Sequence, residues 1–113
     1  MLIVDDVTNK IELTRGDTCA VIVSITDANG DIYELQTGDV LLFTMKLNCN
    51  TTDIVIQKDI SEDSIIALSH NDTKSLNYGN YVYDVQLTQA GGDVYTVIPP
   101  SVFTIAREVT FNA

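Results

Sequence analysis

The sequence predicts an all-β fold, an immunoglobulin-like antiparallel β-sandwich of about seven to nine strands with Greek-key connections, as one domain over residues 1–113. Three observations support this prediction. Several segments alternate apolar and polar residues with period two, turn residues separate these segments, and no segment has the length and periodicity of a long helix. The 113 residues, 45% of them hydrophobic, suffice for one core but not for two. A closed barrel is the main alternative.

Three segments carry the clearest alternation, and each is expected to turn one apolar face inward. Shorter strands are expected at 10–14, 54–59, 64–68, 94–98 and 101–109. The expected inward residues are Cys19, Val21, Val23 and Ile25 in segment 18–26, Leu41, Phe43, Met45 and Leu47 in segment 40–48, and Tyr81, Tyr83, Val85 and Leu87 in segment 80–88.

Turn residues separate these strands. Asn29 and Gly30 form a strong hairpin signal, because both residue types tolerate a positive φ. A second turn is expected at 90–93, and one helical turn at 71–76, capped by Asn71 or Asp72. The pair at 99–100 consists of prolines, which cannot donate to a strand ladder, so the chain is expected to change sheets there.

A tyrosine-corner pattern strengthens the immunoglobulin-like prediction. Gly79, Tyr81 and Tyr83 have the spacing in which the first tyrosine begins a strand and its hydroxyl bonds back to the preceding loop backbone. Tyr83 would take the place usually held by the second cysteine. The chain has no Trp, so an antibody-type domain is excluded.

Charge and targeting signals restrict the partners. Sixteen acidic and six basic residues give a net charge of -10, which repels nucleic acid and anionic membrane surfaces. No stretch approaches a membrane-spanning length, and the N-terminus lacks the basic start and apolar run of a secretory signal. Synthesis in a reducing cytoplasm is therefore expected. Cys19 and Cys49 are expected to be small buried side chains, and a bridge between them is left open.

No pattern of catalytic or cofactor-binding residues is recognised. His70 is the one histidine, and no nucleophile, phosphate-loop or metal-ligand spacing accompanies it, so neither enzymatic activity nor a catalytic, cofactor or metal residue is expected. The segment from Asp27 to Asp31 has the first ligand positions of a calcium loop. Ile32 and Gly38 stand where that loop requires Gly and Glu, so turn chemistry is the preferred interpretation and a weak site stays open.

Two further motifs are interpreted as ordinary loop chemistry. The tripeptide Arg15-Gly16-Asp17 matches an integrin ligand but falls between two predicted strands, where a turn explains it. The glycosylation sequons at Asn50 and Asn71 need a secretory route that this N-terminus does not offer.

Two longer runs carry a family resemblance. Ile-Glu-Leu-Thr-Arg-Gly-Asp-Thr at 11–18 and Gly-Asn-Tyr-Val-Tyr-Asp-Val-Gln-Leu-Thr at 79–88 resemble the N-terminal domain of phage baseplate upper proteins and their short prophage-encoded relatives. The resemblance extends over residues 10–109 and implies an immunoglobulin-like sandwich of the virion tail. The baseplate proteins continue into a helical linker and a fibre, whereas this sequence stops at Ala113, which implies a tail or baseplate accessory.

The resulting hypothesis is a virion structural protein, made in the bacterial host cytoplasm, that assembles with other tail or baseplate proteins or with copies of itself. Leu2, Ile3 and Val4, or segment 101–109, are the expected assembly arms, because exposed strand edges can add a neighbouring strand. The alternative is a carbohydrate- or cell-surface-binding module. Tyr33, Tyr78 and Tyr95 are the tyrosines left as possible sugar platforms, although the lack of Trp counts against this alternative.

Overall fold

The computed structural model describes residues 2–4, 7–27 and 29–109, and this part of the chain is nearly all-β. One short helix, α1, interrupts the series of strands. The elements in chain order are β1 (Leu2–Val4), β2 (Ile11–Thr14), β3 (Cys19–Ile22), β4 (Val40–Lys46), β5 (Ile56–Asp59), β6 (Ile65–Leu68), α1 (His70–Thr73), β7 (Gly79–Thr88) and β8 (Val94–Ala106).

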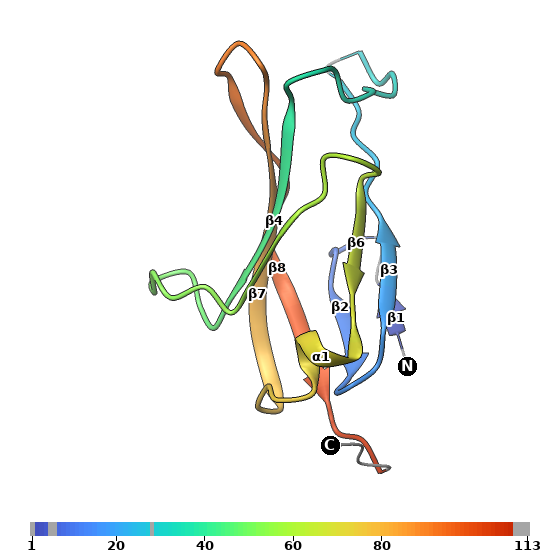
Figure 1. Ribbon diagram of the computed structural model, residues 1–113, viewed down its shortest axis with the longest axis vertical. Helices are drawn as coiled ribbons and strands as arrows, with labels where there is room; N and C mark the ends of the chain where they lie inside the picture. Colours follow the sequence, from blue (N-terminus) through green and yellow to red (C-terminus); the bar gives the residue numbers. More distant parts are fainter. Residues whose placement is uncertain (1, 5–6, 28, 110–113) are drawn as a thin grey trace.

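The strands form two layers (Figure 1). Six strands make a large sheet in the order β1-β2-β8-β7-β4-β5, and β3 and β6 make a small sheet. The large sheet is mixed, because β2 runs parallel to β8 while its other pairs are antiparallel. The expectation of a wholly antiparallel sandwich is therefore wrong. The chain leaves β2 for the other layer and returns along β8 much later, which permits parallel pairing.

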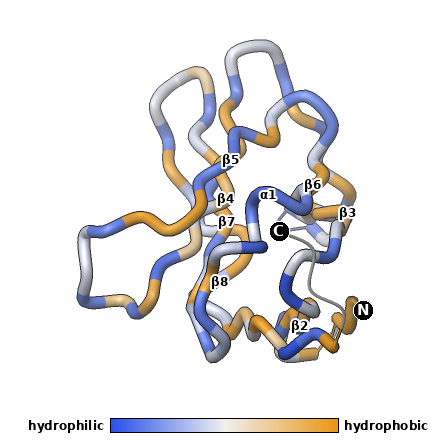
Figure 2. The backbone as a smooth tube through the Cα atoms, turned by 60° about the horizontal axis from the view of Figure 1, so that its bottom comes forward, coloured by the Kyte–Doolittle hydropathy of each residue, from blue (hydrophilic) through white to orange (hydrophobic). Residues whose placement is uncertain are grey.

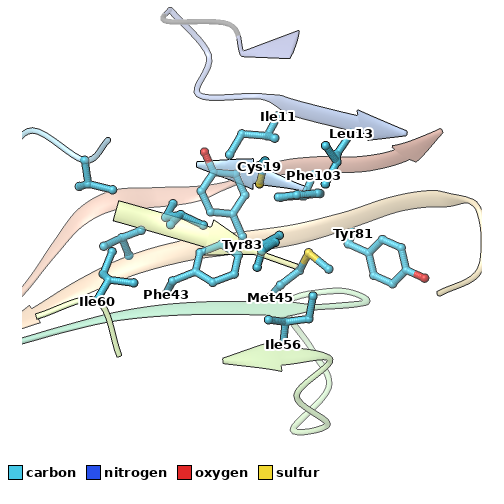
Figure 3. Close-up of a cluster of buried hydrophobic side chains, with 14 of the residues drawn as sticks. Ile11, Leu13, Cys19, Phe43, Met45, Ile56, Ile60, Tyr81, Tyr83 and Phe103 are labelled. Atoms are coloured by element: carbon cyan, nitrogen blue, oxygen red, sulfur yellow. The ribbon is translucent and has the colours of Figure 1, made fainter. Parts of the chain in front are cut away.

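The core lies between the layers. Hydrophobic and hydrophilic residues are interleaved along much of the chain (Figure 2), and alternate residues of β2, β4 and β7 are buried. Phe43, Tyr83 and Phe103 lie near the centre of the core (Figure 3). The centre of the Tyr83 ring lies 5.7 Å from the centre of the Phe43 ring and 5.9 Å from that of the Phe103 ring. The inward assignment of segment 80–88 is confirmed, since all four of its predicted residues are buried. Burial of each of the aromatic side chains Phe43, Tyr83 and Phe103 contributes about 1.5–3 kcal/mol to the stability of the fold.

Two burial predictions and one predicted strand bound are wrong. Leu47 is 60% exposed, because β4 ends at Lys46 and the ladder does not continue past it. Strand β3 ends at Ile22 rather than at residue 26, although Val23 and Ile25 remain buried. Cys49 is exposed, which contradicts its expected burial.

The thiols are not bridged. Cys19 is buried and Cys49 is exposed, and both cysteines are free. The strand predicted at 40–48 would have ended directly before Cys49. Strand β4 instead ends at Lys46, and the Cys49 thiol is exposed to solvent.

The turn at 27–30 forms with a geometry different from the predicted one. Gly30 has φ 83°, whereas Asn29 does not use the left-handed region. The amide of Gly30 donates to the carbonyl of Asp27 (3.0 Å), and the amide of Asp27 donates to the carbonyl of Asp31 (2.8 Å). Only Gly30 thus exploits the conformational freedom that the Asn-Gly pair suggested.

The proline pair does not divide β8. The strand runs unbroken from Val94 to Ala106 within the large sheet, so the expected change of sheet at 99–100 is wrong. Its pairing with β7 shifts register between Tyr83 and Gln86, opposite the prolines. Since β2 reaches only the stretch of β8 from Phe103 to Ala106, no strand on that side needs the missing proline donors.

Helix α1 begins one residue earlier than predicted. Its N-cap is Ser69, not Asn71 or Asp72, and it ends at Thr73. The Asp72 carboxylate accepts hydrogen bonds from the Ser69 amide (2.7 Å) and hydroxyl (3.1 Å). This reciprocal capping arrangement has a sequence signal, a serine followed three residues later by an acidic side chain.

Candidate functional site

Strand β1 forms one edge of the large sheet. It pairs only with β2, in the register Leu2 with Leu13, Ile3 with Glu12 and Val4 with Ile11. Its three side chains are 37–47% exposed, although all of them are apolar. The second side of β1 has no strand partner within the described ranges, so its backbone groups are available for a further strand. Of the expected arm, Met1, Asp5 and Asp6 lie outside the described residues.

A second apolar surface covers the outside of the small sheet. Ala20 pairs with Ala67, and Ile22 pairs with Ile65; these four residues form the small-sheet face. Ile22 is 74% exposed, and among the described residues no strand lies over the outer layer that β3 and β6 form (Figure 1). The sequence prediction placed Ala20 on the outward side of segment 18–26, together with Thr18, Ser24 and Thr26, but did not single out Ile22 and so missed this apolar face. Its only signal was the uninterrupted run from Cys19 to Val23.

The Arg-Gly-Asp turn is packed into the domain. Gly16 has φ 84°, and the amide of Asp17 donates to the carbonyl of Thr14 (3.0 Å), as expected of a turn. The guanidinium of Arg15 binds the Glu108 carboxylate at 2.8 Å and lies 4.2 Å from the centre of the Tyr78 ring. Arg15 is therefore engaged within the domain and fixes the segment that follows β8.

The Tyr78 end of the domain forms a polar cluster. Glu108 also accepts a hydrogen bond of 2.5 Å from the Tyr78 hydroxyl. Hydrogen bonding to Arg15, followed by that to Tyr78, lowers the pKa of Glu108. Arg107 lies 4.6 Å from the centre of the same tyrosine ring. These contacts engage Tyr78 within the chain and remove it from the possible sugar platforms.

Tyr33 and Tyr95 come together at the opposite end of the sandwich. Both line a cleft of about 550 Å³ between the β7–β8 hairpin and segment 24–33. Sequence reasoning singled out both tyrosines but had no means of pairing them, because 61 positions separate them in the chain. We call this site the hairpin cleft. The other residues lining it are Ser24, Ile25, Thr26, Asp27, Leu87, Gln89, Thr96 and Val97.

A shallower hollow of about 360 Å³ lies on the outer face of the large sheet, over β4, β5 and β7. Lys46, Gln57, Asp84 and Gln86 contribute polar groups to it, and the exposed Cys49 lies at its border. Burial raises the pKa of Asp84, and the charge of Lys46 partly opposes this effect. The hollow offers polar contacts on this face of the sheet.

His70 and one carboxylate oxygen of Asp27 contact backbone groups of the fold. The Nδ1 atom of His70 lies 2.7 Å from the carbonyl oxygen of Gly16. One oxygen of Asp27 accepts the amides of Asn29 (2.9 Å) and Asp31 (3.1 Å), which is turn chemistry. Within the described part of the chain, no three His, Cys, Asp or Glu side chains cluster as metal ligands would.

These observations define the class: a small, nearly all-β, two-layer protein that offers strand edges, apolar faces and a cleft at one end. Comparison with known proteins adds no particular identity, since no family model, curated protein or solved structure matches the chain. Over residues 2–4, 7–27 and 29–109, no helix has the length and apolar character needed to cross a membrane.

Proposed function

We propose that the domain is an immunoglobulin-like sandwich. Within the large sheet, the order β8-β7-β4-β5 corresponds to the G-F-C-C′ order of variable-type immunoglobulin domains, and β3 and β6 correspond to strands B and E. The hydroxyl of Tyr81 donates to the carbonyl of Asn77 at 2.8 Å, which is the contact of a tyrosine corner. Strand β1 is an addition at the edge next to β2.

We further propose that the chain is a structural protein of a phage or prophage virion, acting in the tail or baseplate through protein–protein assembly. The resemblance of residues 10–109 to baseplate upper protein N-terminal domains supports this function. The observation that carries it is β1, an apolar edge strand whose side chains are half-exposed and whose second side has no strand partner among the described residues. A neighbouring chain that adds a strand there gains backbone hydrogen bonds and buries Leu2, Ile3 and Val4.

The small-sheet face extends the proposed assembly surface. Its four side chains are apolar and uncharged, and Ile22 is 74% exposed. The net charge of -10 favours association with a basic partner, because opposite charges speed the encounter of the two proteins. The same charge disfavours contact with an acidic surface. A partner with an apolar centre and a basic rim therefore fits the domain best.

A substitution at the β1 edge tests the assembly proposal. Ile3→Lys places a charge in β1, the strand whose free edge a partner strand would cover in the proposed complex. The matched control is Leu47→Lys, which adds the same charge at a residue that is 60% exposed and outside the strands. Both variants are compared with the unaltered chain by sedimentation velocity, alone and mixed with the tail and baseplate proteins of the same genome.

The proposal predicts a complex that Ile3→Lys weakens and Leu47→Lys preserves. Deletion of residues 1–7 should have the same effect as Ile3→Lys. If the deletion and the substitution both leave the sedimentation profile and the recovery of tail proteins unchanged, the assembly role of β1 is wrong.

A further inference from the structure

The hairpin cleft exists because the large sheet is longer than the layer that covers it. Tyr95 lies opposite Leu87 in the β7–β8 ladder, so both side chains point to the inner face of the sheet. Leu87 is 3% exposed, whereas Tyr95 is 52% exposed. In Figure 1 the β7–β8 hairpin rises beyond β3 and β6, opposite the loops that follow β3. The inner face of the hairpin is therefore open to a ligand.

Hydrogen bonds within the domain fix the position of Tyr33, one of the two tyrosines that line the cleft. The hydroxyl of Tyr33 donates to Asp39 at 2.5 Å and lies 3.3 Å from the side-chain nitrogen of Gln89, which donates to it. Asp39 is buried, and it also accepts the amides of Gln36 (2.9 Å) and Ala90 (3.1 Å). One carboxylate thus connects Tyr33 to the turn of the hairpin. This connection orders the cleft before a ligand arrives.

The charges of the cleft select the class of ligand. Among the described residues that line it, Asp27 is the one with a charge, and none is Lys, Arg or His. An anionic ligand would meet this carboxylate within a chain of net charge -10. Phosphates, nucleotides and acidic sugars are therefore disfavoured, whereas a neutral ligand meets no electrostatic penalty.

The shape and the polar groups narrow the choice further. A volume of about 550 Å³ lies within the range of about 300–1,000 Å³ that is typical of small-ligand clefts. Tyrosine combines an apolar ring face with a polar hydroxyl, and Ser24, Thr26 and Thr96 add short polar side chains. A sugar ring presents the complementary surface, because its C–H face is apolar and its rim carries hydroxyls.

We propose that the hairpin cleft binds a neutral saccharide. The exposed ring of Tyr95 stacks on one face of the sugar, and the side chains of Gln89 and Asp27 bond its hydroxyls. Turn formation occupies one oxygen of Asp27, and the other has no hydrogen-bond partner among the described residues. The site uses neither β1 nor the small-sheet face, so it is independent of the proposed assembly function.

Titration of the isotope-labelled full chain by two-dimensional NMR tests this inference. The probes are glucose, galactose, rhamnose and N-acetylglucosamine, each added in millimolar excess, with glucuronic acid as the anionic comparison. We expect at least one neutral sugar to give saturable shifts at Tyr33, Gln89 and Thr96. Tyr95→Ala should weaken its apparent affinity about tenfold, equivalent to one stacking contact.

The matched control is Val94→Ala, the neighbouring position on the other face of β8, where the side chain is 54% exposed. This variant should bind the sugar like the unaltered chain. The inference is overturned if no neutral sugar shifts the resonances of the cleft, if Val94→Ala weakens binding as much as Tyr95→Ala, or if glucuronic acid binds equally well. Shifts produced only by short apolar peptides would likewise overturn it and assign the cleft to a peptide.

Discussion

The hydroxyl of Thr73, a fully buried residue at the end of α1, accepts a hydrogen bond of 2.9 Å from the backbone amide of Gly16. This contact joins the helix to the turn between β2 and β3. His70 supports the same junction, since its Nδ1 atom lies 2.7 Å from the carbonyl oxygen of Gly16. Helix α1 is too short to be stable alone, so its conformation depends on these contacts.

Thr73→Val should therefore destabilise the protein by about 1–3 kcal/mol, because the isosteric side chain leaves the amide of Gly16 without an acceptor. Chemical denaturation followed by circular dichroism measures this difference. The control is Thr104→Val, at a strand position where the hydroxyl is more accessible; we expect a change within about 0.5 kcal/mol. Equal stability of Thr73→Val and the unaltered protein would contradict the structural role assigned to this hydroxyl.

Tyr81→Phe should cost about 0.5–1.5 kcal/mol, because it removes the hydrogen bond to the Asn77 carbonyl and keeps the buried ring. Tyr95→Phe makes the same chemical change at a ring that is 52% exposed, and it should leave stability nearly unchanged. Urea unfolding curves of the two variants provide the comparison. A loss for Tyr95→Phe as large as that for Tyr81→Phe would argue against the tyrosine corner.

The sequence was sufficient to predict the strands whose alternation is long and regular. In β7 the period-two pattern identified every inward residue, because β4 pairs with it in one uninterrupted register, from Val40 opposite Thr88 to Lys46 opposite Val82. The same pattern misplaced Leu47, since alternation continues in the sequence beyond the point where pairing stops. Periodicity describes the side chains and does not reveal where the partner strand ends.

The proposed binding surfaces were less predictable, because they depend on pairings between segments distant in the chain. Leu2, Ile3 and Val4 stood out as an apolar segment, but only the structure places them at the edge of the large sheet. Tyr33 and Tyr95 were recognised separately, and their meeting in one cleft depends on the length of the β7–β8 hairpin relative to the small sheet. The parallel pairing of β2 with β8 had no local signal at all.

Stability should fall in acid as Glu108 and Asp39 are protonated. Hydrogen bonds from Arg15 and Tyr78 lower the pKa of Glu108, and the hydrogen bond from Tyr33 is the largest cause that lowers the pKa of Asp39. Each carboxylate thus contributes stability that is complete above its unfolded pKa (4.5 for Glu108 and 3.8 for Asp39) and is lost as the pH falls through its folded pKa.

Urea titrations at a series of pH values from neutral to strongly acidic check this expectation. Glu108→Gln should flatten the acid limb of the stability profile, because one of the two carboxylates no longer titrates. Glu62→Gln makes the same substitution at an exposed residue and is the matched control. An acid limb that is equally steep in the protein and in Glu108→Gln would exclude Glu108 as a contributor.

Gly38→Ala should destabilise the protein by more than about 1 kcal/mol, since Gly38 has φ 90° and an added Cβ would lie 2.9 Å from the Cβ of Ala90. Both the backbone conformation and the contact oppose a side chain at this position. Gly91→Ala is the matched control, because Gly91 lies outside the left-handed region and an added Cβ meets no atom within 4 Å. Thermal unfolding should therefore show a lowered midpoint for the first variant and little change for the second.

The two thiols should differ sharply in reactivity. Cys49 is exposed and should react with a disulfide reagent in the native protein at the rate of an accessible thiol. Cys19 is buried, and burial raises the pKa of its thiol, so its reaction must wait for local or global opening. The reagent should therefore modify one thiol rapidly in buffer and the second only in denaturant, with Cys49→Ser abolishing the rapid phase and Cys19→Ser the slow one. Rapid modification of both thiols in the native protein would contradict the placement of Cys19 between the two sheets.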